Sequence, residues 1–204
     1  MSTELTEQKR LNIIDSATRM FLAHGYRNTS MDKIAQAAPV SKATLYNHFD
    51  NKEALLAAVV SKLCNALLET MTQAKVDSDD VENSLKKIAD SFVALIFSAD
   101  ALAIFRLAIA ESREFPELSQ LFYDSGPKVA LLQLETYLHQ LNDSGRLKII
   151  NPTFAADAFF SLLKGDLHLQ CLLAKKPLPT NQEKQQLVNN ALTFYMRGIL
   201  LIDH

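Results

Sequence analysis

Between residues 42 and 48 the chain carries side chains whose chemistry suits the surface of nucleic acid. The segment reads KATLYNH, and in a helix Leu45 would face inward while its neighbours face outward. Phosphate oxygens accept hydrogen bonds from Lys, Tyr and His donors, an Asn amide fits adenine, and a methyl group fits thymine. The expected phosphate contacts are Lys42, Tyr46 and His48, and the expected base contacts are Ala43, Thr44 and Asn47.

Two short helices joined by a tight turn, from Thr29 to Phe49, would position these side chains. The side chains of Ser30 and Ser41 are placed to cap the two helices, because each can accept a hydrogen bond from an unpaired backbone N–H. Apolar residues recur at helical spacing and predict a buried face. These residues are Met31, Ile34, Ala35, Ala38, Leu45 and Phe49. A longer helix is expected from Lys52, whose position in the first turn favours an anion such as a phosphate. The hydroxyls of Thr29 and Ser30 and the ammonium of Lys52 complete the predicted phosphate contacts.

This region resembles the tetracycline repressor (TetR/AcrR) family of bacterial transcription regulators. The resemblance covers roughly the first 60 residues and is carried by FLAHGYRNTS, TSMDKIA, VSKATLYNHF and NKEALL. It implies a helix-turn-helix that binds double-stranded DNA and a helical regulatory domain that follows it. The family usually has Gly where this chain has Pro39. Because the proline ring fixes φ near −65°, Pro39 cannot take a positive φ, and we expect the turn to be built differently.

Composition favours an all-α protein. The 204 residues are 48% hydrophobic and include only 5 Gly and 6 Pro. The net charge is −2, but from Arg27 to Lys52 four basic side chains stand against two acidic ones, so nucleic-acid binding must be local. Cys64 and Cys171 lie far apart and suggest neither a disulfide framework nor a zinc site. With no apparent signal peptide or membrane-spanning segment, we expect a cytoplasmic protein.

The rest of the chain reads as further helices. Their expected ranges are residues 8–24, 52–75, 81–98, 101–113, 117–123, 127–142, 152–174 and 181–202. We therefore expect a DNA-binding domain over residues 1–55 and a ligand-binding and dimerisation domain over residues 56–204. The stretch from AESREFPELSQLFY to Gly145-Arg146 resembles the regulatory domain of the AefR-like subgroup.

The last two predicted helices are apolar over more surface than packing within one subunit needs. Leu169 and Phe194 lie on this surplus face. The family resemblance implies that the same helices of a second subunit cover it, forming a four-helix bundle in a homodimer. The alternative is a large core within one subunit.

A small-molecule effector is the second partner that the resemblance implies. An apolar cavity among the middle helices would suit a hydrophobic or amphipathic molecule. Its expected wall consists of Phe92, Leu102, Phe105, Arg106, Leu132, Phe159 and His168. Two of these residues could instead have a structural role. Arg106 could form an ion pair with an acid such as Glu111, and His168 could be a hydrogen-bonded residue of the interior.

Sequence patterns for catalysis are missing. We find no Gly-rich phosphate loop, no His pair at metal-ligand spacing and no nucleophile elbow, so no catalytic residue, metal site or cofactor is expected. The sequence therefore predicts a ligand-responsive, dimeric regulator, a repressor that an effector releases from a palindromic operator. The alternatives are a helical interaction protein without DNA binding, which only Pro39 favours, and an all-α enzyme.

Overall fold

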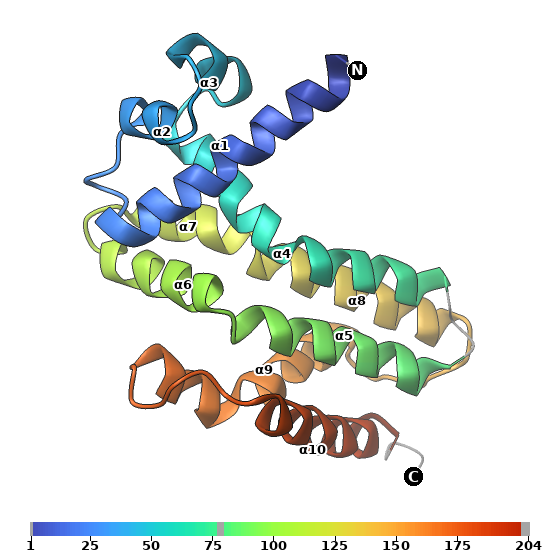
Figure 1. Ribbon diagram of the computed structural model, residues 1–204. Coiled ribbons are helices and arrows are strands. Elements are labelled where there is room, and N and C mark those ends of the chain that lie inside the picture. The colour runs from blue at the N-terminus through green and yellow to red at the C-terminus, as the bar shows by residue number, and fades with distance from the viewer. Residues whose placement is uncertain (1, 77–79, 201–204) are drawn as a thin grey trace. The chain divides into compact units, whose positions relative to one another are not determined.

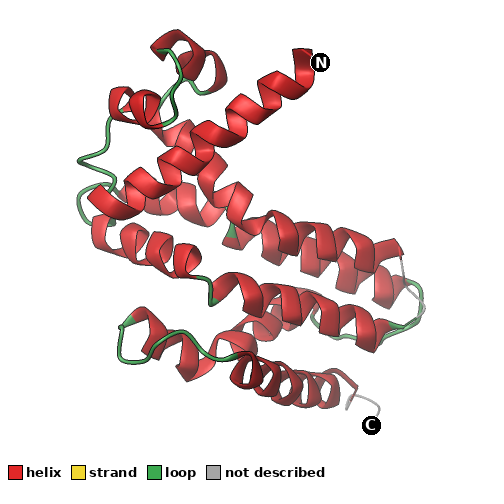
Figure 2. Cartoon of the chain, viewed as in Figure 1, coloured by secondary structure: helices red, strands yellow, loops and turns green. Residues whose placement is uncertain are grey.

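The computed structural model describes residues 2–76 and 80–200, which form ten α-helices and no strand (Figure 1, Figure 2). The helices are α1 (Ser2–His24), α2 (Met31–Ala37), α3 (Lys42–His48), α4 (Lys52–Val76), α5 (Val81–Ile96), α6 (Ala99–Glu111), α7 (Pro116–Ser125), α8 (Pro127–Asp143), α9 (Pro152–Leu172) and α10 (Asn181–Leu200). The prediction of an all-α fold with an N-terminal helix-turn-helix is confirmed.

The helices pack into two compact units. One unit combines the chain up to Leu63 with Ala103–Gly126, and the other combines Cys64–Leu102 with the chain from Pro127 onward. Helices α4 and α6 each contribute residues to both units. The first unit therefore contains more than the predicted DNA-binding domain, because most of α6 and all of α7 pack with it. The predicted functional boundary after residue 55 stays a prediction.

Helices α1, α2 and α3 share one apolar core in the first unit. The buried side chains from these helices include Ile13, Ile14, Ala17, Phe21, Ile34 and Leu45. Helix α1 starts at Ser2, earlier than the predicted start near Gln8. Residues 2–7 are mostly polar but include two Glu and one Leu, which are good helix formers, so α1 extends back to the first described residue.

Both predicted caps of the helix-turn-helix are confirmed. The Ser30 side chain accepts a hydrogen bond from the Lys33 backbone N–H at 3.3 Å, and Ser41 Oγ accepts one from Thr44 at 3.0 Å. A side-chain oxygen at the N-cap pairs an N–H that the helix itself leaves open. These bonds fix where α2 and α3 begin and hence which side chains α3 turns outward.

The turn between α2 and α3 keeps a positive φ at Pro39, contrary to the prediction. The Pro39 φ is 22°, and the Val40 N–H donates to the Ala35 carbonyl oxygen at 3.1 Å. This six-to-one hydrogen bond is half of a Schellman motif. The other half requires an N–H at position 39, which proline lacks. The flanking hydrogen bonds therefore impose a glycine-type turn on a residue whose ring opposes it.

In the second unit, α10 packs against α5 and α9, and α9 also packs against α8. Four aromatic rings connect α5, α9 and α10. The Phe92 and Phe160 ring centroids lie 4.5 Å apart, Phe160 and Phe159 5.5 Å, and Phe159 and Tyr195 5.1 Å. We call Phe92, Phe160, Phe159 and Tyr195 the aromatic row. The first of these contacts is tilted, and the other two are edge-to-face, a geometry that aromatic quadrupoles favour.

Helix α9 is interrupted, although the sequence predicted one helix over residues 152–174. Gly165 has φ 51° and ψ −163°, so two helical segments meet at a kink inside α9. Only glycine adopts this backbone region without strain. The final helix was predicted to reach Ile202. Helix α10 is described to Leu200, and Ile202 lies outside the described residues.

Candidate nucleic-acid interface

Helix α3 presents a polar face to solvent. Leu45 is fully buried, whereas Lys42, Ala43, Tyr46 and Asn47 are exposed, Tyr46 at 47%. Thr44 and His48 are half-buried. The predicted outward set of α3 thus lies on one accessible surface, while Leu45 anchors the helix to the core.

Two side chains of this face have partners within the protein. The Lys42 ammonium forms an ion pair with Asp32 of α2, Nζ to Oδ2 2.5 Å, between two exposed side chains. The Thr44 hydroxyl lies 2.8 Å from Ser41 Oγ. An exposed ion pair stabilises a protein little, so a phosphate can replace Asp32 as the partner of Lys42. Thr44 is held close to the cap, which leaves its methyl group as the freer contact.

The polar side-chain atoms of Thr29, which is buried, and of Lys52, which is half-buried, are bonded within the protein. Thr29 is 1% exposed, and its hydroxyl donates to the carbonyl oxygens of Met20 and Gly25 at 3.1 and 2.8 Å. The Lys52 ammonium donates to the carbonyl oxygens of Tyr26 and Thr29 at 2.9 and 3.1 Å. This geometry does not support the phosphate contacts predicted for either side chain. Ser30 is exposed, but its hydroxyl oxygen already caps α2.

Tyr26 is a residue of this region that the sequence analysis did not single out. Its hydroxyl donates to Glu53 Oε1 at 2.8 Å, and its ring contacts Phe21 at a centroid distance of 5.5 Å and Phe115 at 6.3 Å. Burial and the Glu53 carboxylate raise the pKa of Tyr26. The sequence signal that could have pointed to Tyr26 is an aromatic residue directly after Gly25, the glycine that follows α1.

The predicted effector residues do not form one cluster within a unit. Phe92, Leu102, Phe159 and His168 are buried in the second unit, whereas Phe105 and Arg106 belong to the first. Phe105 contacts Phe122 edge-to-face at 5.4 Å, and Arg106 is exposed. Leu132 is 51% exposed, because the core face of α8 is formed by Leu134, Tyr137, Leu138 and Leu141 and Leu132 lies on its other side. A cavity inside this unit therefore does not include Leu132.

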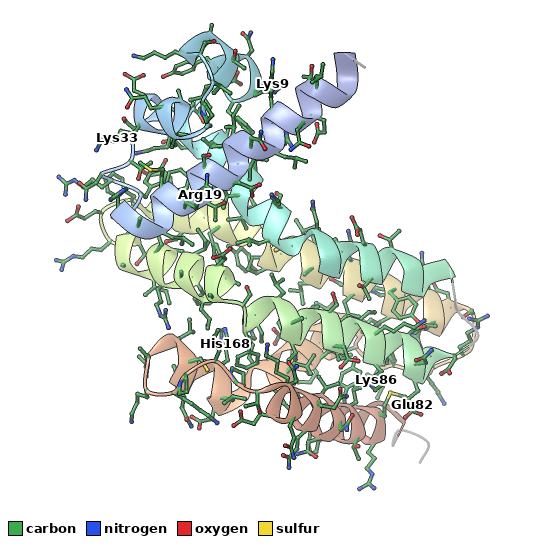
Figure 3. All side chains as sticks on the ribbon, viewed as in Figure 1. Lys9, Arg19, Lys33, Glu82, Lys86 and His168 are labelled. Carbon is green, nitrogen blue, oxygen red and sulfur yellow. The ribbon has the colours of Figure 1, made fainter. Side chains whose placement is uncertain are left out.

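His168 lies on the side of α9 that faces the end of α5 (Figure 3), where its ring meets Phe97 edge-to-face at 5.7 Å. Burial, reinforced by Lys164, lowers the pKa of His168 to about 4. The imidazole is therefore neutral near pH 7 and presents one donor and one acceptor to its surroundings.

The aromatic row ends in a polar group that lacks a partner. The Tyr195 side chain is 4% exposed, and its hydroxyl has no hydrogen bond among the described residues. Burial raises the pKa of Tyr195, so the phenol stays neutral and is available as a donor. An unpaired buried hydroxyl is unfavourable, and a polar atom of a bound molecule would relieve that cost.

Helices α9 and α10 expose large apolar side chains. In α9, Phe154 is 68% and Leu169 53% exposed, Leu173 directly after α9 is 63% exposed, and Phe194 in α10 is 69% exposed. Leu169 and Phe194, the residues predicted to lie on the surplus apolar face, are thus exposed on this chain.

The described part of the chain has neither a cluster of metal-ligating side chains nor a single helix suited to span a membrane. No group of three or more His, Cys, Asp or Glu side chains is placed there to hold a metal ion. No single described helix has the length and apolar composition to cross a membrane, and only α5 and α6 taken together, bent by 65°, pass that test.

The sequence matches two families. Residues 13–59 match the family described as bacterial regulatory proteins, tetR family, and residues 83–198 match the AefR-like transcriptional repressor C-terminal domain. YvkB of Bacillus subtilis (strain 168), an uncharacterised HTH-type transcriptional regulator, is 25% identical over 194 residues, or 92% of this chain and 95% of YvkB. Further relatives, also regulators, are matched over 31% to 50% of their own length.

Solved structures share the fold over nearly the whole chain. The flavonoid-responsive regulator FrrA is 32% identical with a TM-score of 0.73, covering 94% of this chain and 97% of FrrA. A TetR-family transcriptional regulator from Mesorhizobium loti MAFF303099 has a TM-score of 0.80 at 24% identity, covering 95% of this chain and 97% of that protein. The similar proteins named here are regulators of transcription rather than enzymes.

Proposed function

The chain belongs to the TetR family of bacterial transcription regulators, and on that premise we propose that it is a dimeric repressor released from a palindromic operator by a small apolar or amphipathic effector. The observation that carries the DNA-binding part is the face of α3, where capped helices and a buried Leu45 hold a donor-rich surface toward solvent. A protein that binds the chromosome of a bacterium works in the cytoplasm, and that location follows from the proposed role.

The contacts to DNA divide by side-chain chemistry. We assign phosphate contacts to Lys42, Tyr46 and His48, with Ser30 at the start of α2 as a further hydroxyl. We assign base contacts to Asn47, whose amide fits adenine, and to the methyl groups of Ala43 and Thr44, which fit thymine. Thr29 and Lys52 are left out of the direct contacts, because their polar atoms are bonded inside the protein.

Selection of bound DNA from a random pool tests the DNA-binding proposal. We expect an enriched palindrome whose half-sites lie about one helical turn apart, roughly 10–10.5 bp between centres. Asn47→Ala should relax the preference at one base pair, which corresponds to about 1–3 kcal/mol, and leave the other positions unchanged. A pool that shows no enrichment at any salt concentration would instead favour a helical interaction protein without DNA binding.

The dimer would bury the exposed apolar side chains of α9 and α10. Phe194→Glu would place an unpaired carboxylate in that interface and should disfavour association. Leu5→Glu is a matched control, because Leu5 is 62% exposed on α1 and the substitution adds the same charge elsewhere. Light scattering at micromolar concentration should show a dimer for the wild type and for Leu5→Glu. A monomeric wild type would refute the dimer.

The effector site is proposed at the aromatic row and His168. FrrA is described as flavonoid-responsive, and a flavonoid is an aromatic molecule with polar edges, which suits aromatic rings next to the unpaired Tyr195 hydroxyl. Titration of a flavonoid panel with and without operator DNA tests the link between the two sites. A typical coupling is about 1–3 kcal/mol, and operator and ligand must weaken each other by the same factor. A factor of one in both titrations would show that the two sites are not linked.

A further inference from the structure

The loop between α1 and α2 is fastened to the first turn of α4 by Lys52. The Lys52 ammonium donates to the carbonyl oxygens of Tyr26 and Thr29 at 2.9 and 3.1 Å. It also lies over the Tyr26 ring, 4.0 Å from the centroid. An ammonium has three donors and no acceptor, so two carbonyl oxygens and a π face together meet most of its bonding capacity.

Other bonds fasten the same loop. The Tyr26 hydroxyl donates to Glu53, the residue after Lys52, at 2.8 Å, and the buried Thr29 hydroxyl donates to the Met20 and Gly25 carbonyl oxygens. Adjacent residues of α4 thus hold both the backbone and the side chain of Tyr26. Ser30, which directly follows Thr29, caps α2. The position of the loop therefore sets where α2 begins.

A phosphate contact from Lys52 would require this arrangement to be dismantled. The side chain is half-buried, and it would have to leave the two carbonyl oxygens to which it donates. Lys42 differs on each point, because it is exposed and its ammonium pairs with an exposed carboxylate, that of Asp32. The two lysines therefore stand in opposite environments within the same DNA-binding unit.

We propose that Lys52 is a positioning residue of the DNA interface, whose ammonium ties the α1–α2 loop to α4 and thereby fixes the orientation of α2 and α3, without contacting a phosphate. This inference rests on the proposed DNA-binding function. It predicts that Lys52 affects operator affinity through the shape of the free protein, whereas Lys42 affects it through charge.

Salt dependence of operator binding separates the two roles. Each lysine that neutralises a phosphate contributes about one to the slope of log affinity against log salt. We expect Lys52→Met to weaken binding about tenfold at every salt concentration, with a slope parallel to that of the wild type. Lys42→Met should lower the slope by about one. Lys87→Met, at an exposed lysine of α5, serves as the control that changes neither.

Amide hydrogen exchange of the DNA-free protein provides the second measurement. We expect Lys52→Met to speed exchange in the α1–α2 loop and at the start of α2, while Lys42→Met leaves both unchanged. Lys52→Gln removes the charge but keeps a donor, so it should restore part of the protection and part of the affinity. If Lys52→Met does not fold, Lys52→Gln is carried through both measurements in its place.

Three results would overturn the proposal: a salt slope lowered by about one in Lys52→Met, an unchanged operator affinity, or unchanged exchange in the loop. A wild-type protein that binds no DNA would refute the proposed function instead. In that case the exchange measurement still decides whether Lys52 fastens the loop.

Discussion

The turn at Pro39 and the kink at Gly165 both take a positive φ, but for opposite reasons. At Pro39 the Val40 N–H bond to Ala35 and the cap at Ser41 fix the chain on both sides of the turn. The residue itself resists, because its ring favours φ near −65°. Gly165 is exposed, and nothing lies within 4 Å of the position where a Cβ would stand. Neighbouring hydrogen bonds impose the positive φ at Pro39, whereas at Gly165 the glycine itself permits it.

This difference predicts opposite effects of substitution at the two positions. Where neighbours impose a geometry, a more permissive residue should stabilise the protein without changing its shape. Where the residue permits it, a less permissive residue should strain or reshape the helix. The predictions below test this contrast, beginning with the largest expected effect.

Gly165→Ala should lower the free energy of unfolding by roughly 3 kcal/mol, because φ 51° with ψ −163° is a region that essentially only glycine occupies. Gly198→Ala is the matched control. Gly198 lies in α10 without a positive φ and with open space around it, so alanine should stabilise that helix by about 0.5–1 kcal/mol. Urea unfolding measures both. A more stable Gly165→Ala protein would mean that α9 straightens and that the kink is not held by packing.

Pro39→Gly should raise the free energy of unfolding by roughly 1–2 kcal/mol. Glycine removes the strain of a positive φ and supplies the N–H that completes the Schellman motif, while its larger unfolded-state entropy offsets part of the gain. Pro39→Ala regains the N–H but keeps a Cβ at positive φ, so its gain should be smaller. Thermal unfolding of the three proteins checks the order Gly, Ala, Pro. A Pro39→Gly protein less stable than the wild type would show that the proline is not strained.

Features that neighbouring residues determine could be predicted from the sequence, whereas features that depend on distant partners could not. The caps at Ser30 and Ser41 and the inward position of Leu45 were predicted, because short-range spacing determines them. The inward orientation of Lys52 and Thr29 was missed, because their partners lie on another helix or loop. The kink at Gly165 was missed because a single glycine inside an apolar helical pattern is usually tolerated. Leu132 was placed in a cavity wall because hydrophobicity alone does not say which face of α8 is buried.

Tyr195→Phe should raise the stability of the effector-free protein by about 1 kcal/mol, because it removes a buried hydroxyl without a partner from the aromatic row. Tyr26→Phe is the control of opposite sign, since it removes a hydroxyl that donates to Glu53 and should destabilise the protein. Unfolding in urea without added ligand compares the two. A destabilised Tyr195→Phe protein would mean that the hydroxyl has a partner, and the polar end of the aromatic row would lose its role as a ligand donor.

The smallest effect is expected at the start of α10, where local bonds fix a helix end as they do at the α2–α3 turn. Glu183 accepts hydrogen bonds from Lys176 at 2.6 Å and from the Thr180 backbone N–H at 2.8 Å, and Thr180 caps the helix in return at 3.2 Å. The Lys176 ammonium, followed by the Thr180 bonds, lowers the pKa of Glu183 from 4.5 to about 2. A carboxyl whose folded pKa is depressed stabilises the protein above the unfolded pKa, and that stabilisation is lost as pH falls from about 4.5 toward 2.

Carbon NMR of the Glu183 carboxyl should therefore show little titration down to pH 3, where an ordinary glutamate, with a pKa of about 4.3, is mostly protonated. Glu183→Gln, which keeps the shape of the capping box but loses the charge, should be less stable than the wild type at pH 6, and this difference should shrink as pH falls below about 4.5. The start of α10 differs in this respect from the kink at Gly165. A helix end that a titratable carboxylate holds becomes less stable as the pH falls. The geometry at Gly165 depends on backbone freedom and should not change over the same range. A stability difference between Glu183→Gln and wild type that is constant from pH 6 to pH 3 would show that the carboxylate charge does not hold the start of α10.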